Sequence, residues 1–273
     1  MDTRHPPIGT LIRDWRGRRR MSQLDLALEA EISQRHLSFL ESGRAAPSRD
    51  MVMRLAEQLD VPLRERNRFL LAAGFAPSIP ERTMDDPALE PVMAAVELVL
   101  KGHEPNPAIA VDRHWTLVQG NSAIGPFLAD IADASLLQPP INVLRLSLHP
   151  KGMAPRILNL AEWRAHVLER LHRLFAATGD PVIAELEEEI RSYPQERRGP
   201  SPRHDYSDIA VPLRIRLGDE VLSLITTITV FGTPLDVTMS ELAVESFFPA
   251  DAETAAILRR LAAEREATPA RAY

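Results

Sequence analysis

The run Ser33-Gln34-Arg35-His36 places hydrogen-bonding side chains in succession just before an apolar stretch of the chain. Serine is a typical helix N-cap, because its hydroxyl accepts a backbone N–H that has no partner within the helix. The glutamine and arginine that follow would then project from the first turn of that helix. Glutamine can pair with two atoms of adenine, and arginine with two atoms of guanine. The run therefore has the chemistry needed to read base edges in a DNA groove.

Two short helices joined by a tight bend are predicted around this run. Ser22 is expected to cap the first helix, with Asp25 supporting it from three residues further on. Ser33 caps the second helix, and Gly43 ends it. Two helices of this kind, the second led by polar residues, match the helix-turn-helix, whose second helix lies in the major groove. The alternative is a helical bundle whose polar face is merely solvated.

The segment from Ser22 to Gly43, SQLDLALEAEISQRHLSFLESG, resembles the XRE family, also called Cro/CI-type helix-turn-helix proteins. The pattern Ser-Gln-x-x-Leu-Ala, then Ser-x-x-x-Leu-Ser-x-Leu-Glu-x-Gly, is present without gaps. The resemblance implies that Arg16 pairs with Glu41 and so joins the first helix to the recognition helix. Glu31 stands where the family usually has a turn glycine, so we expect a strained bend there.

DNA contacts of two kinds are expected from the chemistry of these residues and from the resemblance. Base contacts specify the sequence, and phosphate contacts position the protein. The residues expected to read bases are Gln34, Arg35, Ser38 and Phe39. The residues expected to hold phosphates are Gln23, Ser33, Arg44 and Arg49. We therefore expect residues 1–74 to bind double-stranded DNA at a pseudo-palindromic operator, as part of a homodimer.

Charge is distributed unevenly along the chain. Residues 1–82 carry 14 arginines and 11 acidic residues, a balance of +3, and the remainder carries −9. A mildly basic head on an acidic body suggests that only the head meets a polyanion. The absence of cysteine excludes disulfides and thiolate zinc sites. Because no apolar run reaches the length of about 20 residues needed to span a bilayer, we expect a cytoplasmic protein without membrane contact.

Residues 75–87 are rich in proline and charge and are predicted to link the head to a second domain, residues 88–265. That domain should begin with two short strands, Ala108–Val111 and Trp115–Val118, followed by helices. The longest helix is expected over residues 160–175, where apolar residues recur with helical spacing.

Alternating apolar residues then predict an antiparallel hairpin that turns at Gly218, with a third strand after a turn at Gly232–Pro234. This order of strands and helices favours a PAS-like antiparallel sheet flanked by helices. The predicted fold class is therefore α+β: an N-terminal all-α, five-helix helix-turn-helix domain and a C-terminal PAS-like domain. The segment ELAVESFF, residues 241–248, is predicted to contribute a dimer surface.

The second domain also resembles a known family. The strings AVDRHWTLVQGN, NVLRLSLHPKGMAPRILNLAEWRAHVLERL and TTITVFGTPLDVTMSELAVESFFPAD are similar to the MmyB-like ligand-binding domain, which follows an XRE head in some bacterial transcription regulators. The resemblance spans residues 88–262. It implies a PAS-like sheet around an apolar pocket, for which fatty-acid-like ligands have been suggested.

We expect this pocket to lie between the sheet and the helix over residues 160–175. Such pockets are mostly apolar, with a few polar groups that orient the ligand. The residues predicted to line it are Trp115, Phe127, Leu144, Arg145, His149, Trp163 and Val167. Arg145, His149 or Arg156 is expected to meet a carboxylate at the pocket mouth.

Other chemistry has weaker support. Glu162 and His166 lie four residues apart, but His172 is six further on, which is not a shared helix face, and no HExxH motif occurs. We therefore expect no metal and no cofactor. The favoured function is a non-enzymatic transcription regulator modulated by an apolar effector. Two alternatives stay open: an interaction-only repressor or antitoxin-type regulator without a ligand, and an enzyme fused to a DNA-targeting head.

Overall fold

The computed structural model describes residues 6–194, 211–231 and 236–267, which form two compact units. The helical unit comprises Met1–Met84, Ala176–Gly179 and Thr233–Ser240, the last of these described from residue 236 onward. The sheet unit comprises the rest of the chain. The fold class is α+β, as predicted.

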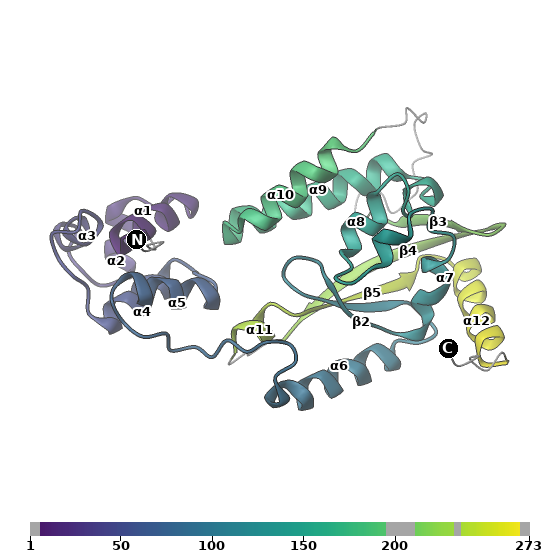
Figure 1. Ribbon diagram of the computed structural model, residues 1–273. Coiled ribbons are helices and arrows are strands. Elements are labelled where there is room, and N and C mark those ends of the chain that lie inside the picture. Colours follow the sequence, from purple (N-terminus) through teal and green to yellow (C-terminus); the bar gives the residue numbers. More distant parts are fainter. Residues whose placement is uncertain (1–5, 195–210, 232–235, 268–273) are drawn as a thin grey trace. The chain divides into compact units, whose positions relative to one another are not determined.

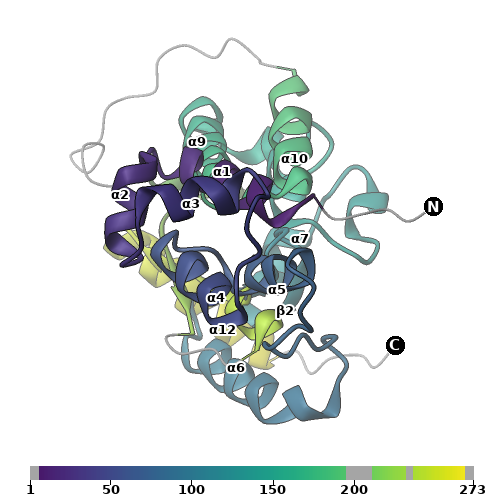
Figure 2. The same cartoon turned by 90° about the vertical axis from the view of Figure 1, so that its left-hand side faces the viewer.

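Five N-terminal helices form the core of the helical unit: α1 (Ile8–Arg18), α2 (Gln23–Glu29), α3 (Gln34–Glu41), α4 (Arg49–Gln58) and α5 (Leu63–Ala72) (Figures 1 and 2). Each helix carries apolar residues on one face, and these faces meet in one core. Ile12, Leu37 and Phe69 are among its fully buried side chains. Removing such apolar surface from water is the main force that holds the bundle together.

Serine side chains start three of these helices, two of them at the caps predicted above, Ser22 and Ser33. Ser22 Oγ accepts from the backbone N–H of Asp25, whose carboxylate in turn accepts from the N–H of Ser22. Ser33 and Ser48 each accept from the backbone N–H three residues later. An N-cap of this kind typically stabilises its helix by about 1 kcal/mol. The first residue of the recognition helix α3 is therefore set by local chemistry.

The bend before α3 has the strained conformation expected from its sequence. Glu31 has a φ of 55°, in the left-handed region that disfavours residues with a Cβ. At the other end of α3, a glycine is needed at residue 9, the second residue of α1. A Cβ there would lie 2.5 Å from the carbonyl oxygen of Leu40 and 2.6 Å from that of Glu41. Gly9 thus lets α1 pack directly on the end of α3.

Part of the segment predicted as a linker is bound to the helical unit. Asn67 of α5 is 5% exposed, and its side-chain oxygen accepts from the N–H groups of Ser78 and Ile79. Its amide nitrogen donates to the carbonyl of Ile79. One buried asparagine therefore holds the chain against α5 after the last of the five helices.

A five-stranded antiparallel sheet forms the centre of the sheet unit: β1 (Ala108–Val111), β2 (Leu117–Gly120), β3 (Leu213–Leu217), β4 (Glu220–Val230) and β5 (Ala243–Pro249). The strand order is β2-β1-β5-β4-β3, so the last strand lies in the middle. β3 and β4 form the predicted hairpin, and Gly218 turns it with a φ of 56°. This is the PAS-like sheet that the sequence favoured.

Helices cover the sheet (Figure 1). The elements α7 (Gly125–Leu128), α8 (Val143–Leu148), α9 (Leu160–Thr178) and α10 (Pro181–Ser192) share one apolar core with side chains of the strands. Two further helices lie against individual strands: α6 (Glu90–Gly102) contacts β1, and α12 (Ala252–Ala267) contacts β4 and β5. The predicted long helix is therefore α9, with three more residues at its end.

The second strand begins later than predicted. Trp115 has a φ of 65°, and its N–H donates to the carbonyl of Asp112. It therefore belongs to the turn, and the strand starts at Leu117.

The third predicted strand also has a different context. A short helix, α11 (Val237–Ser240), precedes β5, whereas the predicted turn at Gly232–Pro234 lies outside the described residues. The expected dimer surface over residues 241–248 stays a prediction. β5 is paired with β1 on one side and β4 on the other, and Val244 and Glu245 are 4% and 3% exposed, whereas Phe248 is 42% exposed. Insertion of the last strand between earlier ones therefore buries part of this segment and leaves part of it accessible.

Candidate DNA interface and ligand cavity

The first turns of α3 expose a row of polar side chains. Gln34, Arg35 and His36 are exposed, whereas Ser38 and Phe39 are partly buried. The leucines of α3 face the core on the opposite side of the helix. Because the polar row stands at the N-terminal end of the second helix of a helix-turn-helix, it has the position from which base edges are read.

Phe39 holds two arginines at this surface. Its ring centroid lies 5.3 Å from Cζ of Arg35 and 5.7 Å from Cζ of Arg44. Cation–π contacts of this kind are worth about 0.5–1 kcal/mol at exposed sites. Arg49 is also exposed and is the first residue of α4. The predicted base-reading and phosphate-binding arginines thus all reach solvent.

A buried carboxylate, Glu41, joins α3 to α1 and α2. Its side chain is 1% exposed and accepts from Arg16 Nε at 2.7 Å, Arg16 Nη2 at 3.1 Å and Gln23 Nε2 at 2.8 Å. Burial opposes ionisation, but these hydrogen bonds and the charges of Arg16 and Arg13 hold the pKa of Glu41 below its ordinary value. The Arg16–Glu41 pair implied by the XRE resemblance is therefore present.

Two predicted phosphate ligands also have structural roles. Gln23 donates to Glu41, and Ser33 caps α3 through its hydroxyl oxygen. A glutamine amide carries two N–H donors, and a serine hydroxyl can donate while it accepts. Each therefore retains a donor for a phosphate, and its DNA contact stays a prediction.

An apolar cavity of about 90 Å³ lies in the sheet unit. Strand residues such as Ile109 and Leu224 form one wall, and α7, α8 and α9 contribute the others. Phe127, Leu144 and Trp163 of the predicted set line it. The cavity thus lies where a pocket was expected, between the sheet and the long helix.

Two other predicted residues lie near this cavity. Val167 is fully buried in the same core. Trp115 is 6% exposed and packs under the guanidinium of Arg170, which lines the cavity, with 4.1 Å between Cζ and the ring centroid.

The polar residues predicted for the pocket mouth are engaged elsewhere. Arg145 makes a bidentate pair with Glu189, at 2.6 and 2.7 Å, which joins α8 to α10. His149 contacts the ring of Tyr193 edge-on, and Arg156 donates to the carbonyl of Phe127. The described lining of the cavity includes none of the three cationic residues that we expected there.

Two charged residues that the sequence analysis did not single out line the cavity instead. Arg170 Nη1 of α9 donates to Glu245 Oε1 of β5 at 2.9 Å, and the two side chains are 14% and 4% exposed. Within the described part of the chain, the Nε and Nη2 atoms of Arg170 are buried without a hydrogen-bond partner. Each buried donor left unpaired typically costs about 1–3 kcal/mol.

The sequence does carry a signal for this pair. Arg170 lies three residues after Val167 and next to Leu171, within the apolar stripe of its helix. Glu245 lies two residues before Phe247, on the same side of its strand. A charge at an apolar position predicts a buried partner or a ligand. Their pairing is not visible in the sequence, because 75 positions separate them.

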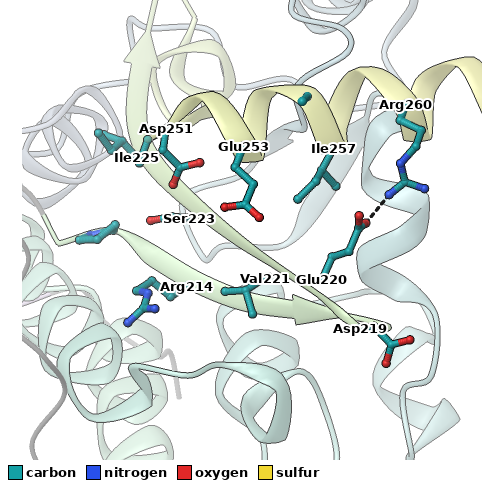
Figure 3. A pocket seen from close by; sticks show the side chains of 13 residues that line it. Arg214, Asp219, Glu220, Val221, Ser223, Ile225, Asp251, Glu253, Ile257 and Arg260 are labelled. Atoms are coloured by element: carbon teal, nitrogen blue, oxygen red, sulfur yellow. Dashed lines mark hydrogen bonds and ion pairs between the residues drawn. The ribbon is translucent and has the colours of Figure 1, made fainter.

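A larger hollow of about 820 Å³ lies between the β3–β4 hairpin and α12 (Figure 3). Asp251, in the turn before α12, and Glu253, on α12 itself, point toward this hollow. Arg260 pairs with Glu220 at one end of it. This lining mixes charged and apolar groups, whereas pockets for apolar ligands are lined mainly by hydrophobic side chains. The smaller cavity therefore fits the expected effector better.

The described residues include no group of three or more acidic or histidine side chains arranged to hold a metal ion. In the same ranges, every helix is too short or too polar to cross a bilayer.

A helix-turn-helix unit joined to a PAS-like domain defines a DNA-binding transcription regulator with a ligand-binding domain. Two family models match the chain: "Helix-turn-helix" over residues 12–66, and "MmyB-like transcription regulator ligand binding domain" over residues 92–261. The chain belongs to the family of MmyB-like transcription regulators. The predicted resemblances are therefore confirmed.

No curated protein matches this chain. A solved structure described as an RNA-binding light-oxygen-voltage receptor is similar, with 14% identity and a TM-score of 0.26. The match covers 95% of this chain but only 63% of the receptor. A TM-score this low carries no argument about the function of this protein.

Proposed function

We propose that this protein binds a specific DNA operator through α3 and that an apolar small molecule in the sheet unit modulates its activity. The observation that carries the proposal is the exposed row at the start of α3, held in place by buried Glu41. Gln34 and Arg35 occupy the base-reading positions of that row, while Gln23, Ser33, Arg44 and Arg49 supply phosphate contacts. Because the regulator acts on DNA, we expect it to work in the cytoplasm of a bacterial cell.

The cavity supports an apolar, fatty-acid-like effector of small size. Its volume of about 90 Å³ is below the roughly 150 Å³ of a cavity that holds benzene and below the roughly 300–1,000 Å³ of most ligand pockets. Even a short acyl chain with as many carbon atoms as benzene would therefore enter only if the lining moved apart. A long chain would require a larger movement.

The active form is proposed to be a homodimer on a pseudo-palindrome. One recognition helix covers few base pairs, and two heads about one helical turn apart supply both affinity and specificity. Apolar side chains of the sheet unit remain exposed, among them Leu98 at 72%, Val99 at 52% and Val230 at 61%. Exposed apolar surface of this kind is available for an interface.

The DNA assignment is tested with an operator selected from a random pool. Gln34→Ala and Arg35→Ala should each cost about 1–3 kcal/mol of binding and relax specificity at one position. Arg44→Ala and Arg49→Ala should weaken binding to all sequences alike and reduce its salt dependence. Arg68→Ala, at an exposed pair on α5, is the matched control and should change neither.

Titrations against operator variants at several salt concentrations measure both effects. Equal, sequence-independent losses for Gln34→Ala and Arg35→Ala would overturn the base-reading assignment.

A further inference from the structure

Arg170 has hydrogen-bonding capacity that the described residues do not use. Its Nε and Nη2 atoms are buried without a partner. Arg156 and Arg164 also have an unpartnered Nε, but each donates through Nη2 to a backbone carbonyl, and neither lines the cavity. Arg170 does line it, beside Glu245 and Ser147 and among apolar residues. The residue with unused donors is therefore part of the cavity wall.

The orientation of this guanidinium is already set. Glu245 holds Nη1, and the Trp115 ring covers one face of the group at 4.1 Å. The Nε–Nη2 edge that remains carries two parallel N–H groups, the arrangement that binds a carboxylate in bidentate fashion. The guanidinium of Arg170 thus has a fixed orientation in the wall of an apolar cavity. This arrangement matches a ligand with a carboxylate head and a hydrocarbon tail.

We propose that Arg170 binds the carboxylate of a short-chain monocarboxylic acid through Nε and Nη2, in competition with Glu245. The inference rests on the proposed effector function and names the head group that the cavity selects. Once a second carboxylate shares the guanidinium, the attraction between Arg170 and Glu245 weakens, because the two anions repel each other. Ligand binding therefore loosens the hold of α9 on β5.

Glu245 lies on β5, and β5 is connected through the chain to the helical unit. Competition for Arg170 is therefore expected to affect that unit. β5 begins three residues after α11 ends, and α11 belongs to the helical unit. The N–H of Val237 donates to the carbonyl of Pro80 at 2.8 Å, and Asp236 pairs with Arg82 at 2.7 Å. A shift of β5 is thus expected to act through the chain on α11, which is hydrogen-bonded to the segment that follows α5.

The head-group assignment is tested by calorimetry on the full chain, with hexanoate as the probe and 1-hexanol as its uncharged counterpart. Wild-type protein should bind hexanoate more tightly than hexanol. Arg170→Met should weaken hexanoate binding by about 10- to 100-fold, the usual value of a charge-assisted hydrogen bond, and leave hexanol binding unchanged. Glu245→Gln should tighten hexanoate binding, because it removes the competing charge.

Arg173→Met is the matched control, since Arg173 lies on the same helix with a side chain 67% exposed. It should bind both probes as the wild type does. Glu245→Gln keeps the proposal testable if Arg170→Met fails to fold, because the two variants are expected to act in opposite directions.

Three results would overturn the assignment. If hexanoate and hexanol bind alike and Arg170→Met changes neither, the cavity is an apolar effector site without a carboxylate anchor. If both variants weaken both probes equally, the Arg170–Glu245 pair is structural. If acids of every chain length and their alcohols fail to bind, the proposed effector function itself fails, and an interaction-only regulator remains.

The route through β5 is tested by hydrogen exchange in peptides that cover residues 236–249. Hexanoate should change their exchange in the wild type and in Arg173→Met, but not in Arg170→Met. Unchanged exchange in these peptides, while hexanoate is bound to the wild type, would overturn the route.

Discussion

Two buried acid–arginine pairs show how the same residue types serve different purposes. Glu41 receives hydrogen bonds from Arg16 and Gln23, so its charge is fully compensated. Arg170 donates only to Glu245 among the described residues and keeps two buried donors unpaired. A compensated pair fits a structural joint, whereas unpaired buried donors require an explanation such as a ligand.

Replacement of Arg16 by methionine should destabilise the helical unit. Glu41 would lose its main partner while it stays buried, and breaking a buried pair in this way costs about 3 kcal/mol. Urea unfolding at neutral pH measures the change. Arg68→Met removes an exposed pair with Glu65 and should cost at most about 0.5 kcal/mol.

The same variant should change the response to acid. The pKa of Glu41 is lowered in the folded protein from an ordinary value of 4.5, so its contribution is present above that pH and is lost as the pH falls through the folded value. Stability of the wild type should therefore decline below pH 4.5. In Arg16→Met the decline should be smaller, because the carboxylate is no longer held ionised. Identical acid profiles for the two proteins would contradict this account.

At the scale of elements, the recognition helix depends on its own ends. Ser33 caps its start, and Gly43, with a φ of 74°, follows its end. α4 starts with an equivalent cap from Ser48. The two serines make the same backbone contact, but only Ser33 is expected to touch DNA as well.

Alanine at either serine should cost about 1 kcal/mol of stability, because each variant loses one N-cap. Only Ser33→Ala should also lower operator affinity, by about 1 kcal/mol or more, through loss of a hydrogen bond to a charged phosphate. Thermal unfolding and operator titration of the two variants separate these effects. Equal affinity losses for Ser33→Ala and Ser48→Ala would remove Ser33 from the set of phosphate contacts.

At the scale of the whole molecule, DNA recognition depends on the proposed homodimer. Sedimentation at micromolar concentration should show two chains per particle and two chains per operator, with half-sites about 10 base pairs apart. Leu98→Glu places a charge on the exposed face of α6 and should promote dissociation. Val182→Glu, at a residue 42% exposed on α10, is the matched control. A monomer that binds its operator one-to-one would refute the dimer.

Most of the helical unit could be predicted from local patterns in the sequence. The caps at Ser22, Ser33 and Ser48 each contact a residue three positions away, and apolar spacing marks the buried face of every helix. The left-handed residue at Glu31 follows from a tight bend between two helices. Because these determinants act over a few residues, they can be read without knowing the fold. The alternating strands of the hairpin were predictable for the same reason.

The centre of the sheet and the charges at the cavity depend on long-range packing. β5 lies in the middle of the sheet because it inserts between β1 and β4, which are distant in sequence. Arg145 faces Glu189 rather than the cavity, and Arg170 meets Glu245 across 75 positions. Side chains at such separations meet only when strand order and helix packing bring them together. Local propensity carries no information on that choice, since it depends on which apolar faces the whole chain can bury at once.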